Sequence, residues 1–266
     1  MSAVDEKVRC FRIENLSVEV HANRESLGAA AALAAANAMK QLGASSGSFG
    51  VIFATGVSQL DTLEALTRIE DIPWDRVRGF HLDEYVGLPI EHRASFRRYL
   101  RENLTRKVDM ESFHEVDGTA ADPDQFCRLY AEKLAAAKPK LCLLGIGENG
   151  HLAFMDPAVA DFKDPRDVKV IRLDAACRAQ QVAEGWFTNF DEVPERAISV
   201  TIPAIFRVPK LIVSVPGSRK AAIMRRTLEE TISTSCPASI LRTHPDVTVY
   251  LDRESASELN GFALPG

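Results

Sequence analysis

Residues Leu141–Pro157 read LCLLGIGENGHLAFMDP, an apolar run followed by a glycine-rich turn and a group of polar side chains. The run Leu141–Ile146 is apolar on both faces, which is typical of a strand buried between helices in a parallel sheet. The segment after it carries four polar residues close together: Glu148, Asn149, His151 and Asp156. Ligands of open α/β sheets bind beyond the carboxyl ends of the strands, so we expect this polar group to lie at a binding site.

An imidazole flanked by carboxylates can act as an acid or a base near neutral pH. A single histidine after a strand is also commonly a hydrogen-bonded loop residue. This stretch alone therefore leaves catalysis and a purely structural role open, and the rest of the chain has to decide between them.

Composition and charge narrow the class of protein. The chain has 266 residues, of which 46% are hydrophobic and 26% are charged, as in ordinary globular proteins, and we expect residues 1–266 to form a single domain. The net charge of −5 argues against nucleic acid as the main partner. No apolar run approaches the roughly 20 residues that span a bilayer, and the first residues show no hydrophobic signal core. We therefore expect a cytoplasmic protein without a membrane partner.

The cysteines give no sign of a metal site. There are five, scattered along the chain without CxxC or Cys/His spacing: Cys10, Cys127, Cys142, Cys177 and Cys236. We expect all of them to be reduced and structural.

Hydrophobic periodicity predicts strands that alternate with helices along the chain. The strands are expected at Leu16–Val20, Phe49–Ala54, Val77–Leu82, Phe113–Val116, Leu141–Ile146, Val168–Leu173, Ala197–Thr201, Lys210–Val215 and Val247–Leu251. The helices are expected at Ala22–Leu42, Gln59–Ile69, Ser95–Leu104, Pro123–Ala137, Ala175–Glu184, Ala221–Glu229 and, at its start, Ala256–Asn260. This alternation indicates an α/β fold with a doubly wound, mostly parallel sheet and helices on both faces, a Rossmann-like three-layer sandwich.

The turn Thr55-Gly56-Val57-Ser58 lies between a predicted strand and a predicted helix. Backbone N–H groups at a helix start, with hydroxyls beside them, form an anion site that suits a phosphate. The alternative is that Thr55 or Ser58 only caps the helix. The turn matches neither a P-loop nor GxGxxG, which disfavours ATP and NAD.

A second turn of this kind is Pro216-Gly217-Ser218-Arg219-Lys220. Lys220 falls in the first turn of the following helix, where a cation opposes the helix dipole. That local inconsistency favours an anion-binding role over a purely structural one.

Asp83 and Glu84 directly follow the strand Val77–Leu82, so they too are expected at the carboxyl edge of the sheet. A carboxylate there can act as a base if partial burial tunes its pKa. The alternative is a solvated acidic turn or a helix cap. The arginines of Ser95–Leu104 are interpreted mainly as a solvated face.

Three segments together resemble the glucosamine-6-phosphate deaminase (isomerase) family, which shares its fold with 6-phosphogluconolactonases. They are HLDEYVGLP at 81–89, GIGENGHLAFMDP at 145–157 and PGSRKA at 216–221. The resemblance runs from about Phe49 to Leu251 with order and approximate spacing intact. It implies the isomerisation and deamination of an amino-sugar phosphate, with no metal or redox cofactor.

The resemblance also implies roles for single residues. Asp83 would move a proton between C2 and C1 of the open-chain sugar, and His151 would shuttle the proton of the ring oxygen. Asp156, where the family commonly carries Glu, would orient His151 and tune its charge, and Asn149 is counted among the catalytic residues. The substrate would be bound by Thr55, Gly56, Val57, Ser58, Glu84, Gly150 and Lys220, with the phosphate on the turn at 55–58 and on Lys220.

Several departures from the family pattern leave the exact sugar open. Many members have Asp where Asn149 stands, and Val57 replaces a glycine. The family's phosphate-binding arginine has no clear counterpart near Gly185-Trp186, where Arg178 and Gln181 are the candidate substitutes. No residues for an allosteric effector are evident around Val159–Lys169, so we expect no such activation, and Ala158–Asp167 is a candidate cover over the pocket.

Two other functions compete. A 6-phosphogluconolactonase would have a segment resembling GxGxDGHTASLFPG, without an acid in the position of Asp156. A non-catalytic sugar-phosphate sensor would need a DNA-binding segment, for which no room precedes the first predicted strand. A homo-oligomer remains possible, and neither the preferred hexosamine nor the physiological direction follows from the sequence.

Overall fold

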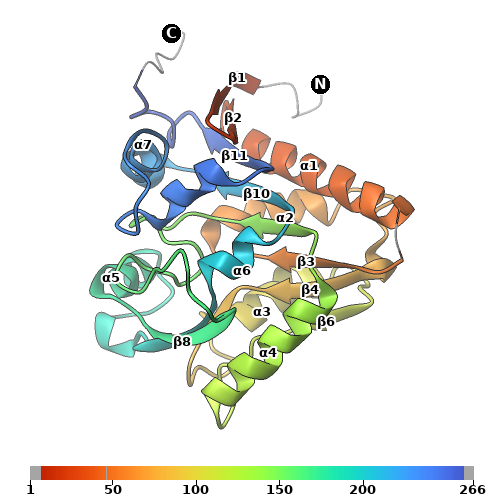
Figure 1. The fold of residues 1–266 in the computed structure, drawn as a ribbon, viewed down its shortest axis with the longest axis vertical. Coiled ribbons are helices and arrows are strands. Elements are labelled where there is room, and N and C mark those ends of the chain that lie inside the picture. Colours follow the sequence, from red (N-terminus) through yellow and green to blue (C-terminus); the bar gives the residue numbers. More distant parts are fainter. Residues whose placement is uncertain (1–6, 46, 261–266) are drawn as a thin grey trace.

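Eight strands form the central sheet, in the order β1-β2-β11-β10-β7-β3-β4-β6 (Figure 1). The computed structural model describes residues 7–45 and 47–260. All neighbouring strands from β2 to β6 in this order run parallel, and β1 pairs antiparallel with β2. The strands are β1 (Lys7–Ile13), β2 (Leu16–His21), β3 (Phe49–Phe53), β4 (Val77–His81), β6 (Ser112–His114), β7 (Leu141–Leu144), β10 (Lys210–Val215) and β11 (Val247–Asp252).

Helices cover both faces of this sheet, because the strands are buried on both sides. Along β3, Val51 and Phe53 pack into one apolar cluster with α1, α2 and α3, whereas Ile52 packs into a second cluster with α4, α6 and α7. The helices are α1 (Arg24–Ser45), α2 (Leu60–Leu66), α3 (Phe96–Leu100), α4 (Pro123–Ala137), α5 (Ala175–Ala183), α6 (Ile202–Phe206) and α7 (Ala221–Glu229). The predicted doubly wound, mostly parallel α/β fold is confirmed.

A second, smaller sheet has three antiparallel strands in the order β5-β9-β8. They are β5 (Asp83–Tyr85), β9 (Arg196–Val200) and β8 (Val168–Arg172). Asp83 and Glu84 were expected just beyond the strand Val77–Leu82, with an acidic turn or a helix cap as the alternative. They lie in a strand of their own, β5, where Asp83 pairs with Ser199. Their backbone groups thus bond to a strand more than a hundred residues away, which local sequence cannot indicate.

Other differences from the predicted elements have local causes. The helix expected over Ser95–Leu104 is α3 followed by one π-helical turn, Arg101–Thr105. The helix expected to start over Ala256–Asn260 is wrong: the chain forms successive turns there. Ser255 and Asp252 exchange side-chain and backbone hydrogen bonds as in a helix cap. The single i to i−4 bond from Ala256 to Asp252 is followed only by i to i−3 bonds, so the segment forms turns. Strand β1 was not predicted.

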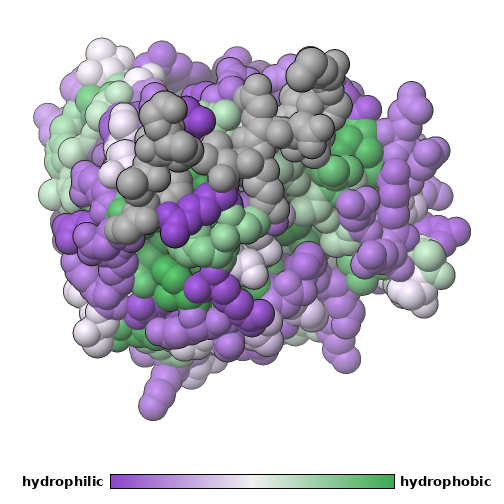
Figure 2. Space-filling view, turned by 90° about the horizontal axis from the view of Figure 1, so that it is seen from above, coloured by the Kyte–Doolittle hydropathy of each residue, from purple (hydrophilic) through white to green (hydrophobic). Residues whose placement is uncertain are grey.

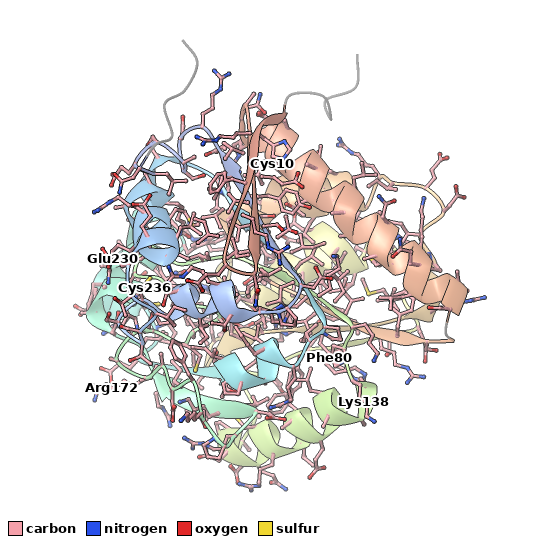
Figure 3. The ribbon with its side chains drawn as sticks, turned by 45° about the horizontal axis from the view of Figure 1, so that its top comes forward. Cys10, Phe80, Lys138, Arg172, Glu230 and Cys236 are labelled. Atoms are coloured by element: carbon pink, nitrogen blue, oxygen red, sulfur yellow. The ribbon has the colours of Figure 1, made fainter. Side chains whose placement is uncertain are left out.

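The surface seen in Figure 2 is mostly hydrophilic, with small apolar patches between charged residues. Among the described residues, the helices are all too short or too polar to cross a bilayer. All five cysteines are free, and four of them are buried. Cys10 on β1 and Cys236 before the last 3-10 helix lie in separate parts of the fold (Figure 3).

Candidate active site

Two glycine turns of nearly the same shape leave β3 and β10, the strands on either side of β7. Gly56 has φ 99° and ψ 170°, and Gly217 has φ 92° and ψ 153°. Residues other than glycine rarely adopt these backbone angles. Each glycine starts a single 3-10 turn, Val57–Gln59 or Ser218–Lys220, which continues into α2 or α7. Both turns therefore place the first backbone N–H groups of a helix at the carboxyl edge of the sheet.

The two turns differ in whether their backbone N–H groups already donate hydrogen bonds to side chains of the protein. Gly217 N–H donates to the carboxylate of Asp252, at 2.9 Å to Oδ2, and Ser218 N–H donates to Glu254 at 3.2 Å. The first turn is braced from behind, where the hydroxyl of Tyr99 donates to the carbonyl of Gly56 at 2.9 Å. The turn at 55–58 is thus the better candidate for backbone contacts to an anion, and the second turn contributes chiefly the side chain of Lys220.

Asp83 lies at the first position of β5, immediately beyond the carboxyl end of β4. Its side chain is buried, with a relative exposure of 6%, and it lines the cavity described below. Burial raises the pKa of Asp83 well above its usual value, and the neighbouring charge of Glu84 raises it further. A carboxyl with a raised pKa is suited to accept and return a proton near neutral pH.

Glu84 faces away from the cavity, because successive side chains of a strand point to opposite sides. Its carboxylate accepts hydrogen bonds from the backbone N–H groups of Tyr85, Phe96 and Arg97 and from the hydroxyl of Ser95. The guanidinium of Arg97 lies 3.6 Å from it. The structure therefore does not bring Glu84, proposed from the sequence as a substrate ligand, to the other candidate residues. Glu84 instead connects β5 to the start of α3 through these hydrogen bonds.

The turn after β7 fixes His151. Gly147 N–H donates to the carbonyl of His151 at 3.0 Å, and Gly150, with φ 88°, closes the turn. The imidazole lies against Gly147 so closely that a Cβ there would be 2.2 Å from the ring. His151 N–H in turn donates to the side-chain oxygen of Asn149 at 3.1 Å. Gly150 itself packs against Cys236 and Ile223, so it shapes the turn and does not line the cavity.

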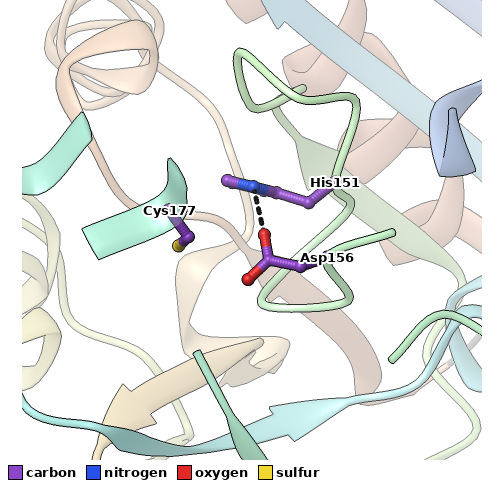
Figure 4. A group of neighbouring side chains, drawn as sticks. All are labelled: His151, Asp156 and Cys177. Atoms are coloured by element: carbon purple, nitrogen blue, oxygen red, sulfur yellow. Dashed lines mark ion pairs between the residues drawn. The ribbon is translucent and has the colours of Figure 1, made fainter. Parts of the chain in front are cut away.

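Asp156 orients the imidazole from behind. Its Oδ1 lies 3.0 Å from Nδ1 of His151 (Figure 4). The same oxygen accepts a hydrogen bond from Asn149 at 2.9 Å. Burial alone would raise the pKa of Asp156, but the contacts with His151 and Asn149 outweigh it and lower the pKa. Asp156 is therefore a stable carboxylate that faces His151, with no exposed surface of its own.

Cys177 completes a group of possible metal ligands with these two residues. Its Sγ, a carboxylate oxygen of Asp156 and a ring nitrogen of His151 lie within 4.8 Å of one another, as Figure 4 shows. Burial raises the pKa of the Cys177 thiol well above its usual value, and the charges of Asp156 and Asp174 raise it further. Metal binding needs the thiolate, which these surroundings disfavour. The group is better suited to an acid/base pair than to a metal.

A cavity of about 250 Å³ collects the candidate residues at the carboxyl edge of the large sheet. Its lining includes Asp83, His151, Lys220 and the whole turn at 55–58. Lys220 is 9% exposed, and burial lowers its pKa. Asp83, His151 and Lys220 thus line the same cavity, as we expected from the sequence.

Several residues of the lining were not among the expected site residues: Arg24, Gln180, Glu184, Trp186 and Arg219. Gln181, which the sequence offered only as a substitute for the missing arginine, also lines the cavity. Arg24 begins α1 and donates to Asp61 on α2 and to the carbonyl of Val57. A signal was available for two of them. Arg24 in a first helical turn and Glu184 at the end of α5 both oppose a helix dipole, which was the argument applied to Lys220.

The fold and the site define an α/β protein with a polar cavity, which is lined by a buried carboxyl, an imidazole, a lysine and a glycine turn. Comparison with known proteins identifies the family. Residues 22–250 match the family model described as glucosamine-6-phosphate isomerases/6-phosphogluconolactonase. The chain belongs to this family.

Its relatives include proteins of both named activities. The chain is 34% identical to a glucosamine-6-phosphate deaminase of Geobacillus sp. over 77% of its length and 82% of that protein. It is also 34% identical to the deaminase of Halothermothrix orenii, over 77% of its length and 84% of that protein. A monomeric glucosamine-6-phosphate deaminase superposes with a TM-score of 0.83 at 29% identity, covering 91% of this chain and 99% of that one. A 6-phosphogluconolactonase of Thermotoga maritima superposes with a TM-score of 0.73 at 18% identity, covering 89% and 99%, which shows the shared fold alone.

Proposed function

We propose that this protein converts glucosamine 6-phosphate, or a close hexosamine 6-phosphate, to fructose 6-phosphate and ammonia. The observation that carries the proposal is that Asp83, His151 and Lys220 line one cavity of a size suited to a single hexose phosphate. The similarity to deaminases over most of the chain supports this choice over lactone hydrolysis.

Ring opening is the first step, and we assign it to His151. The imidazole takes the proton of the O1 hydroxyl and returns it to the ring oxygen as the C1–O5 bond breaks. Asp156 stabilises the imidazolium that forms in between, because its carboxylate faces Nδ1 and leaves Nε2 for the sugar. Asn149 holds both partners in place through its side-chain oxygen and nitrogen.

Proton transfer between two carbons follows, and we assign it to Asp83. The carboxylate removes the proton from C2 of the open-chain sugar, whose amino group is an ammonium. A proton then passes from that nitrogen to O1, which leaves an enolamine with its double bond between C1 and C2 and a hydroxyl on C1. The carboxyl of Asp83 then delivers its proton to C1, and C2 becomes an iminium carbon. Water adds to that carbon and ammonia leaves, so the products are the ketose phosphate and ammonia. The raised pKa of Asp83 suits this shuttle, because the group has to hold the proton between the two transfers.

The phosphate end of the substrate is assigned to the turn at 55–58 and to Lys220. Hydroxyls of Thr55 and Ser58 and the backbone N–H groups beside Gly56 supply hydrogen bonds, and the ammonium supplies charge. We propose no metal or redox cofactor for this reaction, in which protons alone are moved and water is consumed.

The test is an assay of purified protein with glucosamine 6-phosphate, which should release ammonia and form fructose 6-phosphate in equal amounts. A small panel of hexosamine 6-phosphates then identifies the preferred sugar. Hydrolysis of 6-phosphogluconolactone without ammonia from any hexosamine phosphate would move the assignment to the lactonase side of the family.

A further inference from the structure

The cavity contains a carboxylate that the proposed reaction does not use. Glu184 ends α5 and lines the same chamber as Lys220. Its Oε1 accepts a hydrogen bond from Nε2 of Gln180 at 2.7 Å, and its Oε2 accepts one from Nε1 of Trp186 at 3.1 Å. Both donors are neutral, so they fix the position of the carboxylate without cancelling its charge.

The charge of Glu184 acts on the ammonium of Lys220. Burial lowers the pKa of Lys220, and the carboxylates of Glu184 and Glu148 partly offset that effect, which places both of them within electrostatic reach of the ammonium. Glu148 has a second cation near it, because its carboxylate lies 3.4 Å from the guanidinium of Arg219. Among the described residues, the hydrogen-bond donors to Glu184 are only the two neutral side chains named above.

We propose that Glu184 sets the phosphate affinity of the site: its fixed carboxylate lines the same cavity as Lys220 and repels a phosphate dianion placed beside that ammonium. This inference rests on the proposed function, since it takes the phosphate end of a sugar phosphate to lie at Lys220. Like charges in a partly enclosed cavity are screened less than on an open surface. The site therefore binds sugar phosphates loosely, which keeps KM high and lets the phosphorylated product leave.

The experiment is a calorimetric titration of inorganic phosphate into the wild type and three variants. Glu184→Gln removes the charge and keeps the shape, and Glu184→Ala removes the side chain in case the amide of Gln180 rearranges. Glu195→Gln is the control, because it makes the same change in net charge at an exposed residue that pairs with Arg172 outside the cavity. Circular dichroism checks that each variant is folded.

Both Glu184 variants should bind phosphate about three- to tenfold more tightly than the wild type at low ionic strength, and the gain should shrink as salt is added. Glu195→Gln should bind like the wild type. With glucosamine 6-phosphate, Glu184→Gln should lower KM more than it changes kcat. A structural role alone predicts the opposite direction, a loss of affinity.

Equal or weaker phosphate binding by Glu184→Gln overturns the inference, and so does the absence of measurable binding in all four proteins. The proposed function fails separately. If the wild type releases no ammonia, the titration still decides the role of Glu184. If the wild type deaminates the sugar and Glu184→Gln shows no gain, only the present inference is lost.

Discussion

Nδ1 of His151 lies 3.0 Å from Oδ1 of Asp156, and the same imidazole lies face-on against the backbone of Gly147. One contact fixes the direction of the ring and the other fixes its plane. The imidazole is therefore held before any ligand arrives, by residues that come from its own turn. Such preorganisation is what a proton shuttle between two sugar oxygens requires.

Gly147→Ala tests that arrangement directly. A Cβ at this position would lie 2.2 Å from Cε1 and 2.3 Å from Nε2 of His151, so the ring has to move. We expect kcat to fall by about 100-fold, since displacements of about 1 Å have that effect, while the protein still folds. The measurement is ammonia release at saturating substrate. Gly47→Ala is the matched control, because nothing lies within 4 Å of a Cβ there, and a variant of Gly147 as active as this control would contradict the prediction.

Asp83→Asn should abolish activity and make the protein more stable at neutral pH. Burial raises the folded-state pKa of Asp83 above the usual 3.8, so the folded state holds the proton when the unfolded state has lost it. Stability from this group is therefore present below about pH 4 and is lost as pH rises through the folded-state pKa. Asparagine cannot ionise and avoids this loss.

Urea denaturation from about pH 4 to about pH 8 measures the effect, which we expect to reach about 1 kcal/mol or more in favour of the variant at the upper end. The variant should also lose exchange of the C2 hydrogen with solvent deuterium and keep its affinity for phosphate. Normal exchange in Asp83→Asn would remove this residue from the reaction.

Lys220→Met should weaken the binding of sugar phosphate far more than that of its unphosphorylated analogue. The ammonium is almost fully buried, and a charge-assisted contact to phosphate in such a site contributes about 1.5–3 kcal/mol, or about 10- to 100-fold in affinity. Competition assays with both ligands give the ratio. Lys210→Met, which removes a cation paired with Asp246 at the other end of β10, should leave the ratio unchanged. Equal losses for the two ligands would show that Lys220 does not contact the phosphate.

Glu84→Gln should destabilise the protein and affect the substrate only indirectly. The amide would place an NH2 group against backbone N–H donors that now point at a carboxylate oxygen, and Arg97 would lose a buried partner. We expect a loss of about 3 kcal/mol in the free energy of unfolding. Glu115→Gln, at a surface pair with Arg101, should cost less than about 1 kcal/mol. A Glu84 variant with normal stability and a raised KM would instead place this carboxylate at the ligand.

The pair Asp83 and Glu84 also shows where sequence reasoning ends. Carboxyl ends of parallel strands share one edge of a sheet, so the order of strands and turns was enough to predict that 55–58, Asp83, His151 and Lys220 approach each other. The separation of Asp83 from Glu84 depends on β5, whose partner β9 is far along the chain. Without knowledge of that pairing, the sequence does not distinguish the cavity-lining Asp83 from the buried structural Glu84.

The contribution of α5 was equally hidden. Its limits were predicted within one residue, but the direction in which Gln181 and Glu184 point depends on how the helix packs. Gln181 accepts a hydrogen bond from the hydroxyl of Tyr85 at 2.8 Å, a contact between α5 and β5 that no periodicity encodes. The residues that α5 contributes to the cavity are therefore determined by tertiary packing and not by helix propensity.

Asp83 belongs to the three-stranded sheet, whereas His151 stands on a turn of the eight-stranded sheet. The proposed base and the proposed proton shuttle thus lie on different sheets, which are connected through Leu82 between β4 and β5. A hexose that contacts both Asp83 and His151 would link the two sheets. Its arrival should slow amide hydrogen exchange in β5 and β9 more than in β3 or β7, so that the tightening of the smaller sheet becomes a readout of substrate engagement.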